Sequence, residues 1–131
     1  MVRSSLAPSL LALALFVSCS APAPAETSVT LSSERGLVQA TVRFLGPVRR
    51  GENALVAELS AASPGAEPRL AAVSAFMVTH NHEAHAGSIS ETDGGFEASE
   101  LDLFMTGRWQ LELELSVAGE PDLLSLPVDV P

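Results

Sequence analysis

The segment from Trp109 to Val117, WQLELELSV, constrains the fold of this chain more than any other feature. Leucine or valine occupies every second position from Leu111 to Val117, and glutamate or serine fills the positions between them. Successive side chains of a β-strand point to opposite faces, so this alternation predicts a strand with one core face and one solvated face. We expect Trp109, Leu111, Leu113 and Leu115 to be buried.

Strand signals recur along the rest of the chain, and no stretch shows a convincing helical period. The letters DGG between SISET and FEASELDL predict a hairpin with a tight turn. Pro127 in the last run indicates an edge strand, because proline cannot donate a hydrogen bond to a neighbour. Short strands separated by turns every few residues predict an all-β fold, an antiparallel β-sandwich of about seven strands. The strand-forming runs cover residues 27–33, 37–45, 54–61, 70–78, 88–92, 96–103, 109–117 and 123–130.

The N-terminal residues indicate export. Arg3 precedes an apolar run from Leu10 to Val17, which is too short to span a bilayer and is built like the core of a signal peptide. The run leads into FVSC, which resembles the bacterial lipobox, whose cysteine is lipidated and becomes the mature N-terminus. We therefore expect lipidation at Cys19. The alternative is cleavage further on, near APAPA, which would discard Cys19.

These signals divide the chain into three parts. Residues 1–18 are predicted to be a lipoprotein signal peptide, residues 19–26 a Pro/Ala-rich tether, and residues 27–131 one β-sandwich domain. Ser20, rather than Asp, follows the cysteine and suggests outer-membrane sorting. We expect an exported protein that is lipid-anchored in the cell envelope, facing the periplasm. Cys19 is the only cysteine, so the domain has neither a disulfide nor a thiolate nucleophile.

Charge and residue pattern exclude several functions. Without residues 1–18 the chain has six arginines, no lysine and sixteen acidic residues, a net charge of −10. Such an acidic chain is not expected to bind nucleic acid or anionic lipid head groups by charge. No nucleophile lies in a recognisable activating turn, and no carboxylate pair stands out among the acids. We therefore do not expect an enzyme.

All three histidines lie within MVTHNHEAHAG. If the strand continues through His82, then His80 and His82 share one face, about 7 Å apart. His85 becomes a third donor if the following residues turn back, and Met77 and Met105 could add thioethers. Imidazole and thioether without thiolate suit copper, whereas three histidines and a water suit zinc. The alternative is that the histidines are solvated and the methionines fill the core.

Four short motifs together resemble the YtkA-like domain family. GEN opens a strand, FMVTHNH carries Met77, His80 and His82, GGF follows, and FMTGRW carries Met105 and Trp109. The family has Gly-x-Asn, Met-Pro-x-His-Gly-His or Met-Pro-x-Met-x-His, Gly-x-Tyr and Met-x-Gly-x-Trp in the same order. The resemblance extends over roughly residues 46–130. The chain has Val78 where the family usually has proline and Asn81 where glycine is common.

This resemblance implies an immunoglobulin-like sandwich, exported and often membrane-tethered, related to FixH-type proteins. It also implies that the Met77–His82 and Met105–Trp109 segments lie together at one end of the sandwich. Such domains occur near copper-handling and respiratory-assembly envelope proteins, which are the expected partners. Two functions follow as hypotheses. One is a lipoprotein that binds or buffers copper through its His/Met cluster, and the other is a non-catalytic structural or interaction module without metal.

Overall fold

The computed structural model describes residues 27–131, and it confirms the all-β prediction. The predicted signal peptide, the tether and Cys19 lie outside the described residues. Between residues 27 and 131 the structure has no helix that could serve as a membrane span. The strands of this range are β1 (Ser28–Ser32), β2 (Val38–Phe44), β3 (Gly51–Ala61), β4 (Pro68–Met77), β5 (His82–His85), β6 (Ser88–Thr92), β7 (Gly95–Leu103), β8 (Gly107–Val117) and β9 (Glu120–Val130).

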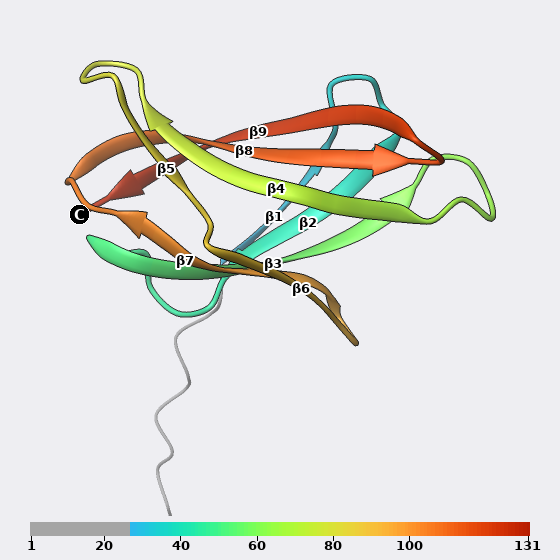
Figure 1. The fold of residues 1–131 in the computed structure, drawn as a ribbon, viewed down its shortest axis with the longest axis horizontal. Helices are drawn as coiled ribbons and strands as arrows, with labels where there is room; N and C mark the ends of the chain where they lie inside the picture. The colour runs from blue at the N-terminus through green and yellow to red at the C-terminus, as the bar shows by residue number, and fades with distance from the viewer. Residues whose placement is uncertain (1–26) are drawn as a thin grey trace, which may run out of the picture.

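The strands form two antiparallel sheets packed face to face (Figure 1). One sheet has the order β1-β2-β3-β7-β6 and the other has the order β5-β4-β8-β9. Without β1, these orders reproduce the two sheets of the immunoglobulin fold, A-B-E-D and C′-C-F-G. The chain is therefore an immunoglobulin-like sandwich with one additional strand at the edge of the first sheet.

The core lies between the sheets, and β8 supplies much of it. Leu111, Leu113 and Leu115 are at most 2% exposed and Trp109 is fully buried, as the alternation predicts. Trp109 Nε1 donates a hydrogen bond of 3.0 Å to the carbonyl oxygen of Met105, so the buried indole has its polar partner. The inward residues of β2, β3, β7 and β9 pack against this face.

The hairpin and edge predictions are also confirmed. Thr92 pairs with Gly95 across the two-residue turn of β6 and β7. Pro127 lies on β9, which is an edge strand with β8 as its only sheet neighbour. The described range contains nine strands, whereas the sequence predicts about seven. The unexpected strand is β5, which contains two of the histidines.

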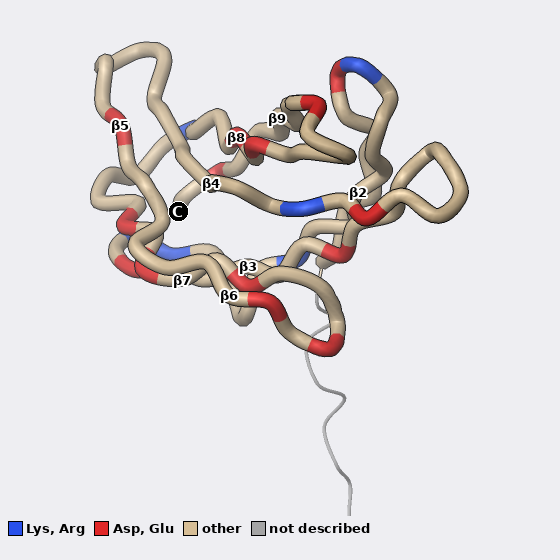
Figure 2. The backbone as a smooth tube through the Cα atoms, turned by 45° about the vertical axis from the view of Figure 1, so that its right-hand side comes forward, with Lys and Arg blue, Asp and Glu red and all other residues tan. Residues whose placement is uncertain are grey.

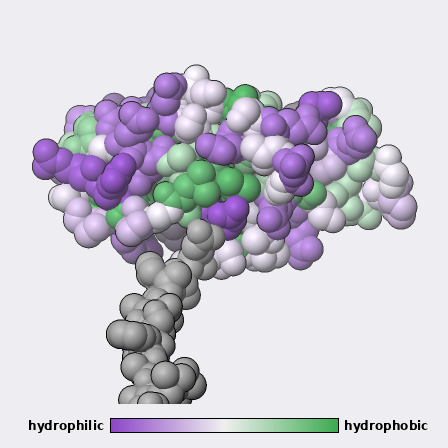
Figure 3. Space-filling model, turned by 90° about the horizontal axis from the view of Figure 1, so that it is seen from below, coloured by the Kyte–Doolittle hydropathy of each residue, from purple (hydrophilic) through white to green (hydrophobic). Residues whose placement is uncertain are grey.

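Charge and hydropathy are unevenly distributed over the surface. Acidic residues lie along both sheets and in the loops, with arginines scattered among them (Figure 2). An apolar patch lies next to the start of the described chain, on the face seen in Figure 3. Acidic residues therefore do not cover every face of the molecule.

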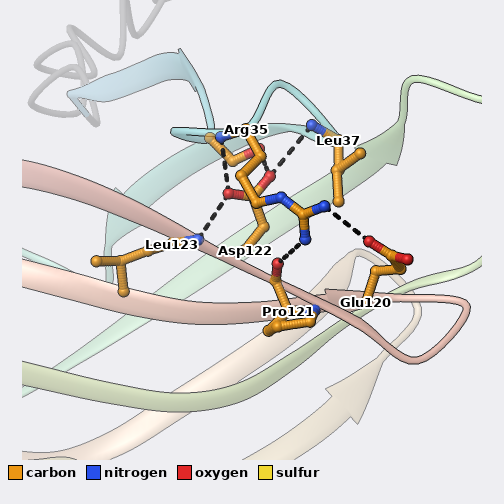
Figure 4. Close-up of polar contacts among 7 residues, drawn as sticks. Arg35, Leu37, Glu120, Pro121, Asp122 and Leu123 are labelled. Atoms are coloured by element: carbon orange, nitrogen blue, oxygen red, sulfur yellow. Dashed lines mark hydrogen bonds and ion pairs between the residues drawn. The ribbon is translucent and has the colours of Figure 1, made fainter.

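A buried carboxylate ties the β1–β2 turn to β9 (Figure 4). Asp122 is 7% exposed and accepts hydrogen bonds from Ser33 Oγ at 2.5 Å and from the backbone amides of Arg35, Leu37 and Leu123 at 2.9, 3.1 and 2.8 Å. Burial alone would raise the pKa of Asp122. The hydrogen bonds from Ser33 and the three amides outweigh burial and hold this pKa below its ordinary value of 3.8.

Candidate functional site

The predicted site residues lie at one end of the sandwich, which we call the histidine end. It is formed by the segments Arg43–Glu52, Met77–Glu83, Asp102–Trp109 and Asp129–Pro131, where strand pairing places Gly51 beside Leu103 and Gly107 beside Val130. A short connection, residues 104–106, joins the two sheets there. The ends of β4 and β7 and the start of β8 lie together in Figure 1. The predicted proximity of the Met77–His82 and Met105–Trp109 segments is thereby confirmed.

The chain turns between β4 and β5 instead of running straight through the histidines. Met77 pairs directly with His82, so residues 78–81 reverse the chain. Asn81 has a φ of 51°, in the left-handed region, which asparagine tolerates better than most residues. The extended path through His82, which was the condition for His80 and His82 to share one strand face, does not occur, because a hairpin turn begins after Met77.

The turn nevertheless brings two of the histidines together. The rings of His80 and His82 are stacked, with centroids 6.2 Å apart and an interplanar angle of 23°. His82 meets the edge of Phe104 at 5.3 Å, and Phe104 meets the fully buried Trp109 at 5.4 Å. His80 is exposed and His82 is half-buried. A continuous row of rings thus runs from the solvent to the core.

The methionines occupy different positions. Met77 is 3% exposed, and its side chain packs over Gly107, where an added β-carbon would lie 2.9 Å from Met77 Cε. Met105 is half-buried against the core, and its carbonyl oxygen holds Trp109. Met77 is the thioether nearest to the histidines in strand register, directly opposite His82. Both methionines contribute to packing in the structure.

His85 is not brought to the other two histidines. His85 lies on β5 and pairs with Ser74 of β4, and its neighbour on β5, Ala84, is buried toward the core. His85 is therefore on the outer face of this strand together with Glu83, and His85 Nε2 lies 3.3 Å from Glu83 Oε1. Both side chains are mostly exposed. His82 belongs to the opposite face of β5.

The donor set at the histidine end is thus two imidazoles with a buried thioether behind them. Within the described residues, no three His, Cys, Asp or Glu side chains converge as a metal-binding group. Two imidazoles that bind one ion through bonds of about 2 Å at a tetrahedral angle place their ring centres roughly 5 Å apart, with the ion in the plane of each ring. The rings of His80 and His82 are 6.2 Å apart and nearly parallel, so they are close to this separation and would have to rotate to converge on one ion.

Phe104 was not singled out in the sequence, although it connects His82 to Trp109. The signal that could have indicated it is its place in FMTGRW, directly after the alternating run that ends at Leu103. Phe104 is 38% exposed, so it borders both the core and the solvent.

Comparison of the chain with family models, with curated proteins and with solved structures gives no match. The immunoglobulin-like fold therefore stands on the strand order and the packing alone. Membership of the YtkA-like family stays a prediction that depends on the four motifs.

Proposed function

We propose that this chain is a non-catalytic, lipid-anchored envelope protein that binds copper at the histidine end of its sandwich. The stacked pair of His80 and His82 carries the proposal. Their side chains lie on an exposed turn and beside a strand end, where an ion can reach them from solvent. The anchor at Cys19, the periplasmic orientation and the partners among metal-handling or respiratory-assembly envelope proteins belong to the same proposal.

The chemistry of the surrounding residues favours copper over harder cations. Imidazole nitrogens bind Cu(II) well, and a thioether adds preference for Cu(I). Met77 is directly opposite His82 in the strand register, so its thioether is the one available from the adjacent strand. When bound, copper would supply either an electron-transfer centre or a transferable ion. His80 and His82 would hold it in place, and Phe104, which contacts His82, would shield one side of it.

A second function is favoured by the packing of His82. This side chain is half-buried and makes an edge contact of 5.3 Å with Phe104, as a structural residue would. In this alternative the protein is an interaction module without metal, and His82 only completes the end of the sandwich. The two functions differ in whether substitution of His80, which is exposed, has any effect on metal binding.

Isothermal titration of the lipoprotein in detergent, with Cu(II) and with Cu(I) under reductant, tests the proposal. His80→Ala and His82→Ala should each remove most of the affinity, because a pair of donors has none to spare. His85→Ala is the matched control, since it removes the same side chain from the opposite face of β5.

Two results would favour the metal-free module instead. One is affinity weaker than about micromolar, which corresponds to roughly 8 kcal/mol. The other is an equal loss in all three histidine variants, which is expected from scattered surface imidazoles. Retained thermal stability of His82→Ala would show that a lost affinity is not simply a lost fold.

A further inference from the structure

Three exposed hydrophobic side chains lie at the histidine end. Among the described residues, the large hydrophobic side chains with substantial exposure are Val78 at 78%, Leu45 at 43%, Val29 at 40% and Phe104 at 38%. Leu45 follows β2, Val78 follows β4 and Phe104 follows β7, so three separate loops each present one of them at the same end. Side chains at three loop tips suit a broad surface better than a narrow groove.

Charge separates this end from the rest of the domain. The four segments that form the histidine end contain four arginines and four acidic residues, whose charges cancel. The rest of the described chain contains two arginines and eleven acidic residues. Figure 2 shows acidic segments over both sheets and also on β5, which borders the histidine end. An anionic surface repels the acidic part of the domain but meets no net charge at the histidine end, so it meets this end at the lowest electrostatic cost.

The described chain begins close to this same end. Ser28 pairs with Arg43, which places Thr27 beside the start of the Arg43–Glu52 segment. The predicted anchor at Cys19 is separated from Thr27 by a tether of eight residues, which spans at most about 29 Å when fully extended. The apolar patch in Figure 3 lies beside this starting point. The opposite end, with the β3–β4 and β8–β9 loops, is a strand length further from the anchor.

From these three observations we infer that the histidine end rests on the lipid surface that carries the anchor. Leu45, Val78 and Phe104 enter the headgroup region, and the arginines Arg49 and Arg50 contact lipid phosphates. The inference rests on the lipid anchor of the proposed function, because the short tether keeps this end at a high local concentration near the membrane. Copper would then be exchanged at the membrane-facing end of the domain.

Depth-dependent fluorescence quenching in reconstituted vesicles tests this orientation. The full-length lipidated protein is placed in phosphatidylethanolamine/phosphatidylglycerol vesicles with brominated acyl chains. A polarity-sensitive probe is attached through Val78→Cys in one sample and through Ser63→Cys in another. Ser63 is an exposed residue of the β3–β4 loop at the opposite end, so it is the matched control. We expect a blue shift and at least twofold quenching at position 78, and neither at position 63.

A charge-reversal pair separates electrostatic attraction from simple proximity. Arg49→Glu with Arg50→Glu should reduce the population of probe in contact with lipid by about fivefold per arginine, and more at low salt than at high salt. Arg69→Glu, near the opposite end, is the control and should leave the quenching unchanged. An equal loss of quenching in the Arg49→Glu/Arg50→Glu variant and in Arg69→Glu would overturn the inference that the histidine end contacts the lipid.

The remaining outcomes distinguish failure of the proposed orientation from failure of the lipid anchor on which it rests. Equal quenching at positions 78 and 63 in vesicle-bound protein would overturn the orientation and leave the anchor intact. Failure of the protein to float with vesicles, with an unmodified Cys19 by intact mass, would overturn both. A blue shift at position 78 that depends on protein concentration without lipid would identify a second copy of the chain as the occupant and overturn the lipid contact.

Discussion

Replacing Asp122 by alanine should destabilise the protein by about 3 kcal/mol at pH 7. The carboxylate accepts one hydroxyl and three backbone N–H groups, and both Asp122 and Ser33 are buried. Each buried donor left without its acceptor costs about 1–3 kcal/mol. An open hollow of about 460 Å³ borders Asp122, so water can reach some of the donors and the lower part of that range applies.

Trp109 makes this loss measurable. It is the only tryptophan and is fully buried, so its fluorescence reports unfolding in a urea titration. The variant should shift the midpoint and leave the slope unchanged. Asp129→Ala is the matched control on the same strand, because that carboxylate is exposed and forms an ion pair with the equally exposed Arg108. It should change the free energy of unfolding by no more than about 0.5 kcal/mol.

The pH dependence has a definite sign. The pKa of Asp122 is lower in the folded state than its ordinary value of 3.8, so its stabilisation is fully present above that value. It is lost as the pH falls through the folded pKa, below 3.8. The difference between the wild type and Asp122→Asn should therefore be constant from about pH 7 to pH 5 and shrink below about pH 3.8. A loss under about 1 kcal/mol at pH 7, or one that grows with acid, would refute this reasoning.

Three further predictions use the same urea titration. Gly107→Ala should cost about 1–3 kcal/mol, because Gly107 has a φ of 125° and a β-carbon there would press on Met77 Cε. Leu113→Ala should cost about 2–5 kcal/mol, because that side chain is fully buried between the sheets. Asn53→Ala should cost about 2 kcal/mol, because its amide bonds Arg49 and Gly51 backbone groups and closes the β2–β3 loop. A change under about 0.5 kcal/mol in any of them would contradict the packing or bonding assigned to that residue.

The fold could be predicted from the sequence because its signals are local. The alternation from Leu111 to Val117 determines one face of β8 within seven residues, and the burial of the leucines follows directly. Asn53 shows the same principle, since its partners lie within four residues. Pro127 identified an edge because a missing N–H has the same consequence in any sheet.

The candidate site was predicted less completely, because it depends on where the chain turns. Residues 78–81 contain neither glycine nor proline, so the sequence has no strong signal for the hairpin turn that ends at His82. The turn uses Asn81 in the left-handed region, where the resembling family commonly has glycine. Once β5 is recognised as a strand, period-two alternation places His82 and His85 on opposite faces.

The Asp122 network could not be foreseen for a different reason. Ser33 and Asp122 are 89 positions apart, and neither belongs to a recognisable motif. Only the strand order places the β1–β2 turn next to β9, where the amide of Glu34 also donates to the carbonyl oxygen of Leu123. Long-range polar contacts of this kind follow from the topology, which the local pattern of hydropathy does not determine.

The proposed use of the histidine end is tested most directly by following the three histidine rings during a Cu(I) titration. Cu(I) is diamagnetic, so the imidazole nitrogen resonances of the ¹⁵N-labelled protein remain observable. The account predicts that the signals of His80 and His82 shift together and saturate at one equivalent, while that of His85 stays in place. Parallel shifts of all three signals, or a shift of His85 alone, would contradict the assignment of the copper site to the stacked pair.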